Sequence, residues 1–287
     1  GMAVEQLDPT PTQGEKLFYI GVAVLATIAP LTLLLVRVIG ERPPLAPPKE
    51  RIRFVEGLKA LGRNKLMVRL LVIELVAYLP FSVTTALLYF YLTYILDAPR
   101  MQSTMGMVSF TAAIFATPAW FWISKPFDKN KVLAFSYFAV IFTSAPLAFL
   151  QPGQVWIAIA LTSTAAFFHM GPQFLLRSMT ADVVDTDALE TGEQRTGTFF
   201  AIVEMAQKFA PTLGVAFAFP LLDVFGFDAT GKHNTAQSLD ALRYMYGFSP
   251  VLPLLIAGIL LWRFPMDRKA HAALQEKLAA RRLGAVA

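Results

Sequence analysis

Long apolar runs alternate with short polar segments along this chain. The hydrocarbon core of a membrane is about 30 Å thick, so a helix needs roughly 20 residues to cross it. Runs of about that length or more occur at residues 17–39, 66–95, 104–124, 132–150, 154–176, 197–222 and 245–263. The pattern therefore predicts an all-α membrane protein with seven transmembrane helices.

Proline and glycine interrupt several of these runs. They occur at Pro30, Pro80, Pro118, Gly171-Pro172 and Pro211. Membrane helices tolerate such residues when neighbouring helices satisfy the freed backbone groups. We expect kinks at these positions and not helix ends.

Composition agrees with a membrane protein. Of the 287 residues, 55% are hydrophobic and 16% are charged, whereas roughly 25% are charged in soluble domains. Cysteine is absent, which excludes disulfides and thiolate metal ligands. The three histidines, His169, His233 and His271, lack the spacing of metal ligands.

Basic residues predict the orientation of the chain. Of the 25 Lys and Arg residues, 20 fall in one set of alternate connections and the C-terminal tail. Because short loops rich in Lys and Arg stay in the cytoplasm, we expect an inner-membrane protein with its N-terminus outside and its C-terminus inside. This placement accounts for the net charge of +5 without a nucleic-acid partner.

The same patterns predict four segments. They are an external segment with the first span (1–39), a proline-rich cytoplasmic linker with a short amphipathic helix (40–65), a six-helix bundle (66–263) and a cytoplasmic tail (264–287). Proline-rich linkers are stiff spacers. One span before such a linker and six after it are expected if the chain begins at the sixth helix of a transporter with two six-helix halves.

Several motifs resemble those of one transporter family. The best is Ala181-Asp-Val-Val-Asp185, followed by Thr191-Gly192 and Gly197. The others are Asn64-Lys-Leu-Met67, Lys208 and the segment from Trp262 to His271. Over essentially the whole chain, the sequence resembles the glycoside-pentoside-hexuronide:cation symporters of the major facilitator superfamily, typified by melibiose permease, from the sixth helix onward.

This resemblance implies secondary active transport by alternating access. The expected substrate is a small-molecule solute, a sugar or glycoside, coupled to Na⁺ or H⁺, with no resident cofactor. The family's cation-binding carboxylates lie in its N-terminal half, so the chain is expected to need that missing half or a partner chain. Gln194-Arg195-Thr196-Gly197 departs from the family pattern, because the basic residue is displaced by one position and an acid is lost.

Glu74, Glu204 and Lys208 lie inside predicted spans and are candidates for the substrate and cation cavity, because a charge there is costly unless it faces a cavity or a partner. The resemblance places Lys208 at a lysine beside the substrate and cation cavity. Glu204 lies four residues before Lys208, so an internal ion pair on one helix face is the alternative. Glu74 is expected at the cavity, or else in an interfacial pair with Arg69 or with its carboxylate snorkelling towards the interface.

Two further residues in the spans, Tyr78 and His169, are candidates for a functional role. Tyr78, near Pro80 and Thr84-Thr85, is predicted to line the cavity. His169 is a candidate proton relay, although a lone histidine on a helix is more often a packing residue.

The acidic segment from Arg177 to Phe200 is expected on the cytoplasmic side, joining two spans, with Asp182 and Asp185 on the last turns of the first helix. There Asp182 and Asp185 are predicted to form a gate latch, with Arg177 as a partner and Arg195 nearby. The alternative is a merely solvated loop.

Other function classes remain open to different degrees. A natural half-protein that acts as a membrane scaffold, or as a subunit completed by a partner, is the alternative to a transporter. An enzyme is not expected, because the sequence shows no nucleophile and base pair, phosphate loop or metal motif.

Overall fold

The computed structural model describes residues 13–38, 54–192, 195–231 and 233–284. The chain divides into two compact units, Gly1–Lys49 and Glu50–Ala287. The described part of the first unit is one apolar helix, α2 (Gln13–Val38). Most of the predicted linker, residues 39–53, lies outside the described residues.

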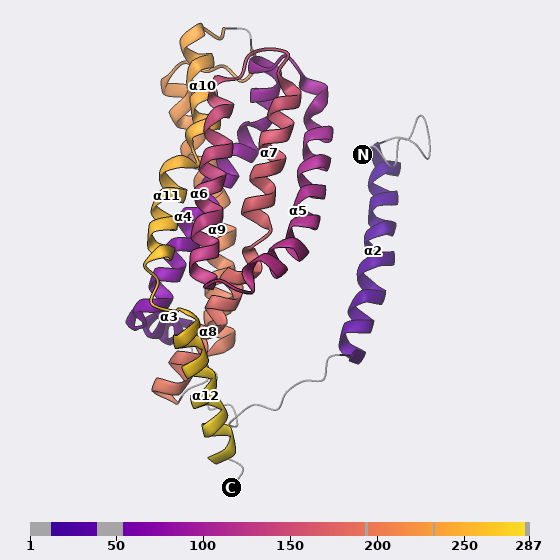
Figure 1. The fold of residues 1–287 in the computed structure, drawn as a ribbon. Coiled ribbons are helices and arrows are strands. Elements are labelled where there is room, and N and C mark those ends of the chain that lie inside the picture. The colour runs from indigo at the N-terminus through magenta and orange to yellow at the C-terminus, as the bar shows by residue number, and fades with distance from the viewer. Residues whose placement is uncertain (1–12, 39–53, 193–194, 232, 285–287) are drawn as a thin grey trace. The chain divides into compact units, whose positions relative to one another are not determined.

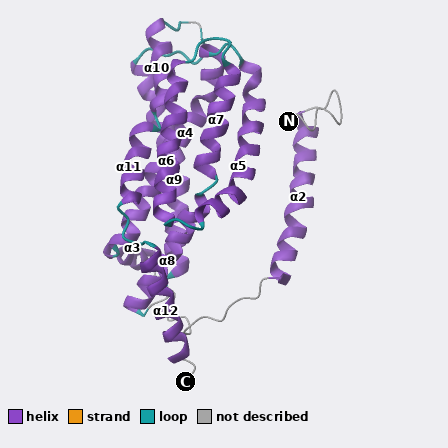
Figure 2. Ribbon diagram, in the orientation of Figure 1, coloured by secondary structure: helices purple, strands orange, loops and turns teal. Residues whose placement is uncertain are grey.

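The described secondary structure of the second unit is helical (Figures 1 and 2). Its α-helices are α3 (Phe54–Arg63), α4 (Lys65–Phe90), α5 (Gln102–Ser124), α6 (Lys129–Ser144), α7 (Val155–Met170), α8 (Gln173–Thr191), α9 (Thr196–Val224), α10 (Ala236–Phe248), α11 (Val251–Trp262) and α12 (Arg268–Gly284). Short helical turns η1 (Tyr91–Ile95), η2 (Pro99–Met101) and η3 (Ala145–Phe149) extend or connect them. The amphipathic helix and the tail helix expected from the sequence are α3 and α12.

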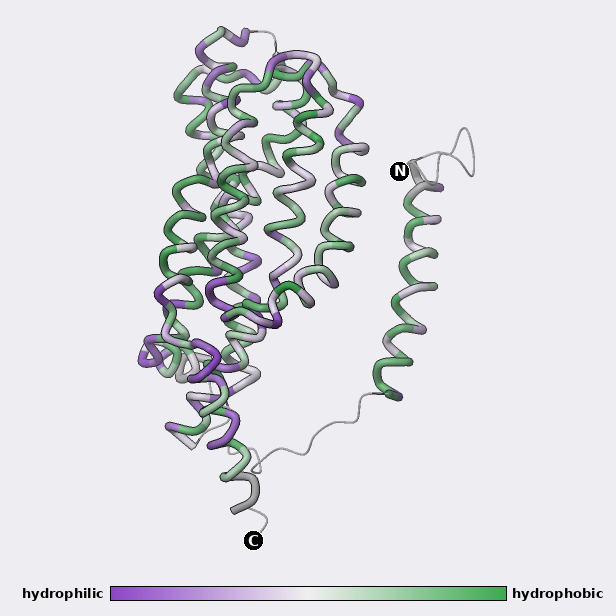
Figure 3. The backbone as a smooth tube through the Cα atoms, in the orientation of Figure 1, coloured by the Kyte–Doolittle hydropathy of each residue, from purple (hydrophilic) through white to green (hydrophobic). Residues whose placement is uncertain are grey.

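Six stretches of the described residues are long and apolar enough to cross a membrane. They are Leu17–Val38, Lys65–Ile95, Pro99–Ser124, Lys129–Phe149, Val155–Thr191 and Ala236–Trp262. The remaining predicted span, 197–222, lies in α9, whose polar Glu204, Gln207 and Lys208 lower its hydropathy. The count of seven spans therefore stays a prediction. Figure 3 shows apolar residues along the bundle and hydrophilic residues concentrated towards its ends.

The expectation that these positions do not end helices was right for four of them and wrong for one, and the expected kinks stay a prediction. Pro30, Pro80, Pro118 and Pro211 all lie inside helices. At Gly171-Pro172, however, α7 ends and α8 begins. Proline has no backbone N–H to continue the helical hydrogen bonds, so the apolar run is divided there.

In the acidic segment, the first helix extends beyond the last turns that the sequence predicted around Asp182 and Asp185. Helix α8 continues to Thr191 and ends at Gly192, whose φ of 73° is left-handed. Glycine adopts this conformation without steric cost, and its N–H bonds the carbonyl of Ala188 at 3.1 Å. The buried Met179 and Val183, four residues apart, bind α8 to the core. The charges thus lie on a packed helix.

The core has two main clusters that fix the helices against one another. One lies around Leu70, Tyr137 and Phe199, and the other around Tyr91. Helices α4 and α9 approach closely at Gly214, where an added Cβ would contact Ser82 and lie 2.9 Å from the carbonyl oxygen of Leu79.

Candidate functional site

Polar and ionisable side chains gather between α4, α8 and α9. Glu74 and Tyr78 lie one turn apart on α4, Arg177 lies on α8, and Glu204 and Gln207 lie one turn apart on α9. Residues three or four apart share a helix face, so each helix presents its members together. We call these five residues the span cluster.

Glu74 is the buried member of the span cluster. Only 1% of its surface is exposed. Gln207 Nε2 donates a hydrogen bond to Glu74 Oε2 at 2.9 Å, and the charges of Arg177 and Glu204 act on Glu74 from close by. The alternative pair with Arg69 does not form, because Arg69 donates to the carbonyl oxygen of Leu260 at 2.7 Å. Glu74 is therefore held by a neutral amide.

Arg177 and Glu204 form an ion pair across helices, with Arg177 Nη1 2.6 Å from Glu204 Oε1. Their side chains are 55% and 40% exposed. The alternative Glu204–Lys208 pair is wrong, since Glu204 binds Arg177. Lys208 is exposed one turn further along α9 and forms no ion pair within the described ranges. Its predicted cavity role is untested.

Tyr78 leads from the span cluster to a group of aromatic rings. Its ring meets that of buried His169 edge-on, with centroids 6.3 Å apart. His169 also stacks with Phe81 and Tyr137 at 5.8 and 5.9 Å. It lines a cavity of about 170 Å³ that Thr84 and Thr85 also border. These contacts favour the packing interpretation of His169.

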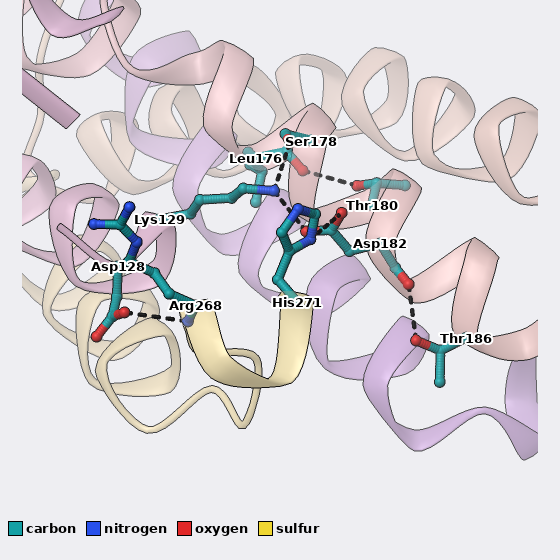
Figure 4. A network of polar contacts seen from close by, with 9 residues as sticks. All are labelled: Asp128, Lys129, Leu176, Ser178, Thr180, Asp182, Thr186, Arg268 and His271. Atoms are coloured by element: carbon teal, nitrogen blue, oxygen red, sulfur yellow. Dashed lines mark hydrogen bonds and ion pairs between the residues drawn. The ribbon is translucent and has the colours of Figure 1, made fainter. Parts of the chain in front are cut away.

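A second cluster joins the start of α6, the middle of α8 and the start of α12 (Figure 4). Its centre is the buried carboxylate of Asp182, whose Oδ2 lies 2.7 Å from Lys129 Nζ. Lys129 also donates to Ser178 Oγ at 2.9 Å. His271 Nδ1 lies 3.1 Å from Asp182 Oδ1 without hydrogen-bond geometry, so this contact is electrostatic and requires a protonated ring. The predicted pairing of Asp182 with Arg177 is wrong.

Asp128 strengthens the attachment of α12. Its Oδ2 lies 3.0 Å from Lys131 Nζ, and its Oδ1 accepts a hydrogen bond from the backbone N–H of Arg268 at 3.2 Å. The hydrogen bond from Lys131, and then that from Arg268, lower the pKa of the Asp128 carboxyl. We call Asp128, Lys129, Ser178, Asp182, Arg268 and His271 the helix-end cluster.

Arg195 belongs to a third contact, at buried Asp187. Asn64 Nδ2 donates to Asp187 Oδ1 at 3.2 Å, and Arg195 Nη1 lies 3.6 Å from Oδ2. Asn64 also caps α4, because its Oδ1 accepts the N–H of Met67 at 3.0 Å. Asn64, the first residue of one motif behind the family resemblance, therefore contacts α8 just after the Ala181–Asp185 motif. Gln194, where the sequence departs from the family, lies outside the described residues.

The predicted gate residues are thus divided among separate contacts. Arg177 binds Glu204, Asp182 binds Lys129, and Arg195 approaches Asp187. Asp185 is half-buried on α8 between these sites. Sequence reasoning missed Gln207, Lys129 and Asp187. Helical spacing could have indicated Asp187, which follows Val183 by four residues, and Gln207, which follows Glu204 by three.

Comparisons with known proteins agree with the resemblance seen in the sequence. The model of a family described as "MFS/sugar transport protein", in which MFS is the major facilitator superfamily, matches residues 3–268. Uncharacterized symporter sll1374 of Synechocystis sp. is 26% identical over 247 residues, which cover 84% of this chain and 45% of that protein. Uncharacterized symporter YnaJ of Bacillus subtilis is 22% identical over 238 residues, covering 83% and 51%. The chain spans about half the length of these relatives.

Proposed function

The chain belongs to the MFS/sugar transport protein family, and on that premise we propose that it forms the C-terminal bundle, with the helix before it, of a solute:cation symporter. A second bundle would complete the transporter, and the two would rock about a shared site. The proposed solute is a sugar or glycoside, and the proposed coupling ion is Na⁺ or H⁺. The names of the relatives, which are symporters about twice as long, support this proposal.

The span cluster carries the proposal. An ionisable side chain inside a membrane costs about 3 kcal/mol on insertion scales, and such residues normally face a cavity or a partner. Arg177 and Glu204 neutralise each other, yet both remain about half exposed. An exposed ion pair is costly against lipid but is well solvated beside a water-filled pathway. We therefore assign this face, with Lys208, to the border of the solute pathway.

The contacts suggest different roles for the exposed and the buried residues of the span cluster. Solute hydroxyl groups would compete for Arg177 and Glu204, whose side chains are accessible. Glu74 is buried, and its hydrogen-bond partner among the described residues is the neutral amide of Gln207, so its carboxyl is suited to respond to the coupling ion. Coupling requires that the ion or solute bind the inward and outward states with different affinities, because equal binding shifts no equilibrium.

We assign the helix-end cluster to the cytoplasmic side, with the N-terminus outside, because 20 of the 25 basic residues then lie in the cytoplasm or near it. There Asp182 would hold α8, α6 and α12 together in one state of the cycle. The gate would open when these contacts separate, so substitutions at Asp182 or Asp185 would change the transport rate more than the solute affinity.

Cation-driven uptake into proteoliposomes tests the proposal. A panel of labelled glycosides is offered to residues 1–287 alone and to the chain joined to its N-terminal half. We expect uptake only from the complete protein, and a clear loss of uptake in Lys208→Ala. Sodium-dependent or proton-dependent uptake by residues 1–287 alone would contradict the half-transporter proposal, and full activity in Lys208→Ala would remove Lys208 from the pathway.

The exposed Arg177–Glu204 face also fits the alternative of a non-transporting subunit or scaffold, in which a partner chain covers this face. Crosslinking in membranes from a cysteine placed beside Arg177, in this naturally cysteine-free chain, distinguishes the two. A crosslink to a separate protein, together with no uptake of any solute by that complex, would favour the subunit.

A further inference from the structure

A cavity of about 630 Å³ opens between the end of α3, the start of α4, the end of α8 and the residue before α9. Its lining includes the basic side chains of Lys59, Arg63, Lys65 and Arg195. Lys59 and Arg63 are four residues apart on α3, so they project from one face of that helix. We call this space the basic cavity.

Among the described residues that line the basic cavity, positive charges outnumber negative charges. Its two carboxylates belong to Asp187 and Glu190. Asp187 is already bound by Asn64 and approached by Arg195. Lys59, Arg63 and Lys65 are exposed and form no ion pair with any residue that the structure describes. An excess of cations over carboxylates around a cavity attracts an anion into it.

The position of the cavity suggests the kind of anion. Lys65, the first residue of one candidate span, lines the cavity. The cavity therefore lies at the level where a membrane meets water, which is where lipid phosphates are found. Basic pockets at the ends of transmembrane helices bind phospholipid head groups, and an arginine fork matches phosphate oxygens.

We propose that the basic cavity binds a phosphate group, carried by an anionic phospholipid of the adjacent leaflet or by a soluble phosphate compound. The site is distinct from the solute pathway, because Asn64 and Glu74 are ten residues apart on α4, or about 15 Å at 1.5 Å per residue. Binding here does not depend on transport activity. A bound phosphate would join α3 to the ends of α4 and α8.

Native mass spectrometry of the purified chain tests this site. Residues 1–287 in a neutral detergent are titrated with short-chain phosphatidylglycerol, with phosphatidylcholine, and with phosphatidylglycerol plus a millimolar excess of inorganic phosphate. The wild type should bind phosphatidylglycerol more tightly than phosphatidylcholine. The double variant Lys59→Gln/Arg63→Gln should bind phosphatidylglycerol about 25-fold more weakly, at about fivefold for each cation lost.

Two further variants separate a site from a general charge effect. Lys269→Gln/Lys277→Gln removes two exposed charges from α12, outside the cavity, and should leave binding unchanged. Lys59→Arg/Arg63→Lys keeps the charges and should bind within about threefold of the wild type, since each lost cation would cost about fivefold. It also checks that substitution at these positions does not disturb the fold.

The phosphate arm identifies the source of the anion. Displacement of the lipid by inorganic phosphate, lost in Lys59→Gln/Arg63→Gln, means that the cavity accepts a soluble phosphate. Retention of the lipid in excess phosphate means that the head group of an anchored lipid is the ligand. Equal binding of phosphatidylglycerol by the wild type and Lys59→Gln/Arg63→Gln, or equal weakening in the α12 variant, overturns the proposal.

Discussion

The span cluster and the helix-end cluster use similar residues in opposite ways. In the helix-end cluster, the Asp182 side chain is 6% exposed and bound by groups from two other helices. In the span cluster, the Arg177–Glu204 pair is open on one side, and buried Glu74 has a neutral amide as its hydrogen-bond partner. In the helix-end cluster the charges bind one another and hold helices together, whereas in the span cluster charged groups remain accessible to a ligand.

The two clusters should contribute differently to the stability of the fold and to transport. A buried carboxylate with several cross-helix partners is costly to remove because its partners lose their counter-charge. An exposed ion pair contributes little to stability, typically less than about 1 kcal/mol. Substitutions in the helix-end cluster should therefore affect unfolding first, and substitutions in the span cluster should affect transport first.

The largest effect is expected from Glu74→Gln. The substitution keeps the shape and a hydrogen-bond acceptor for Gln207, but removes the ionisable carboxyl. We expect cation-driven uptake by the complete transporter to fall about 100-fold, equivalent to a charged hydrogen bond of about 3 kcal/mol. Glu276→Gln, which changes an exposed carboxylate on α12, is the matched control. Normal uptake by Glu74→Gln would assign Glu74 to structure alone.

Asp182→Asn should have the largest effect on stability. It removes the counter-charge of Lys129 and the negative neighbour of His271 Nδ1 together. Because Lys129 is partly exposed, we expect a loss of about 2 kcal/mol, less than the roughly 3–5 kcal/mol of a fully buried pair. Thermal unfolding of the purified chain, with Glu276→Gln alongside, measures it. A change no greater than in the control would show that the cluster does not hold α12 in place.

Arg177→Gln separates the two clusters most directly. We expect uptake to fall about tenfold, or about 1.4 kcal/mol, while the free energy of unfolding changes by less than about 1 kcal/mol. Uptake kinetics and thermal unfolding of the same preparation give the ratio. If unfolding changes more than uptake, the span pair is structural and the contrast with Asp182 fails.

The smallest expected effect is the pH dependence of stability that Asp128 contributes. The pKa of Asp128 is lowered in the folded chain by Lys131 and Arg268, so its contribution is present above the unfolded pKa and is lost as pH falls through the folded pKa. Because the pair is at the surface, we expect less than about 1 kcal/mol. The Asp128→Asn variant should be less stable than wild type at neutral pH and equal to it in acid. An unchanged difference across the pH range would contradict this assignment.

The sequence predicted the helices far better than the contacts between them. The run at 66–95 coincides closely with Lys65–Ile95, because hydropathy is a local property of consecutive residues. The limits of α8 were missed because its carboxylates look like a loop, although they are interleaved with buried valines. The partners of Arg177 and Asp182 depend on how α8 packs against α9, α6 and α12, and no local pattern records that packing.

The close approach at Gly214 has a mechanical consequence. A side chain there would collide with Ser82 and the Leu79 carbonyl, so the backbones of α4 and α9 lie close together. We expect such closely packed helices to move as one rigid body. Glu74 and Gln207, which share a hydrogen bond, belong to these two helices, whereas Arg177 belongs to α8. During a conformational change, the Glu74 carboxyl and the Gln207 amide should therefore move together. The contact expected to break is the Arg177–Glu204 ion pair.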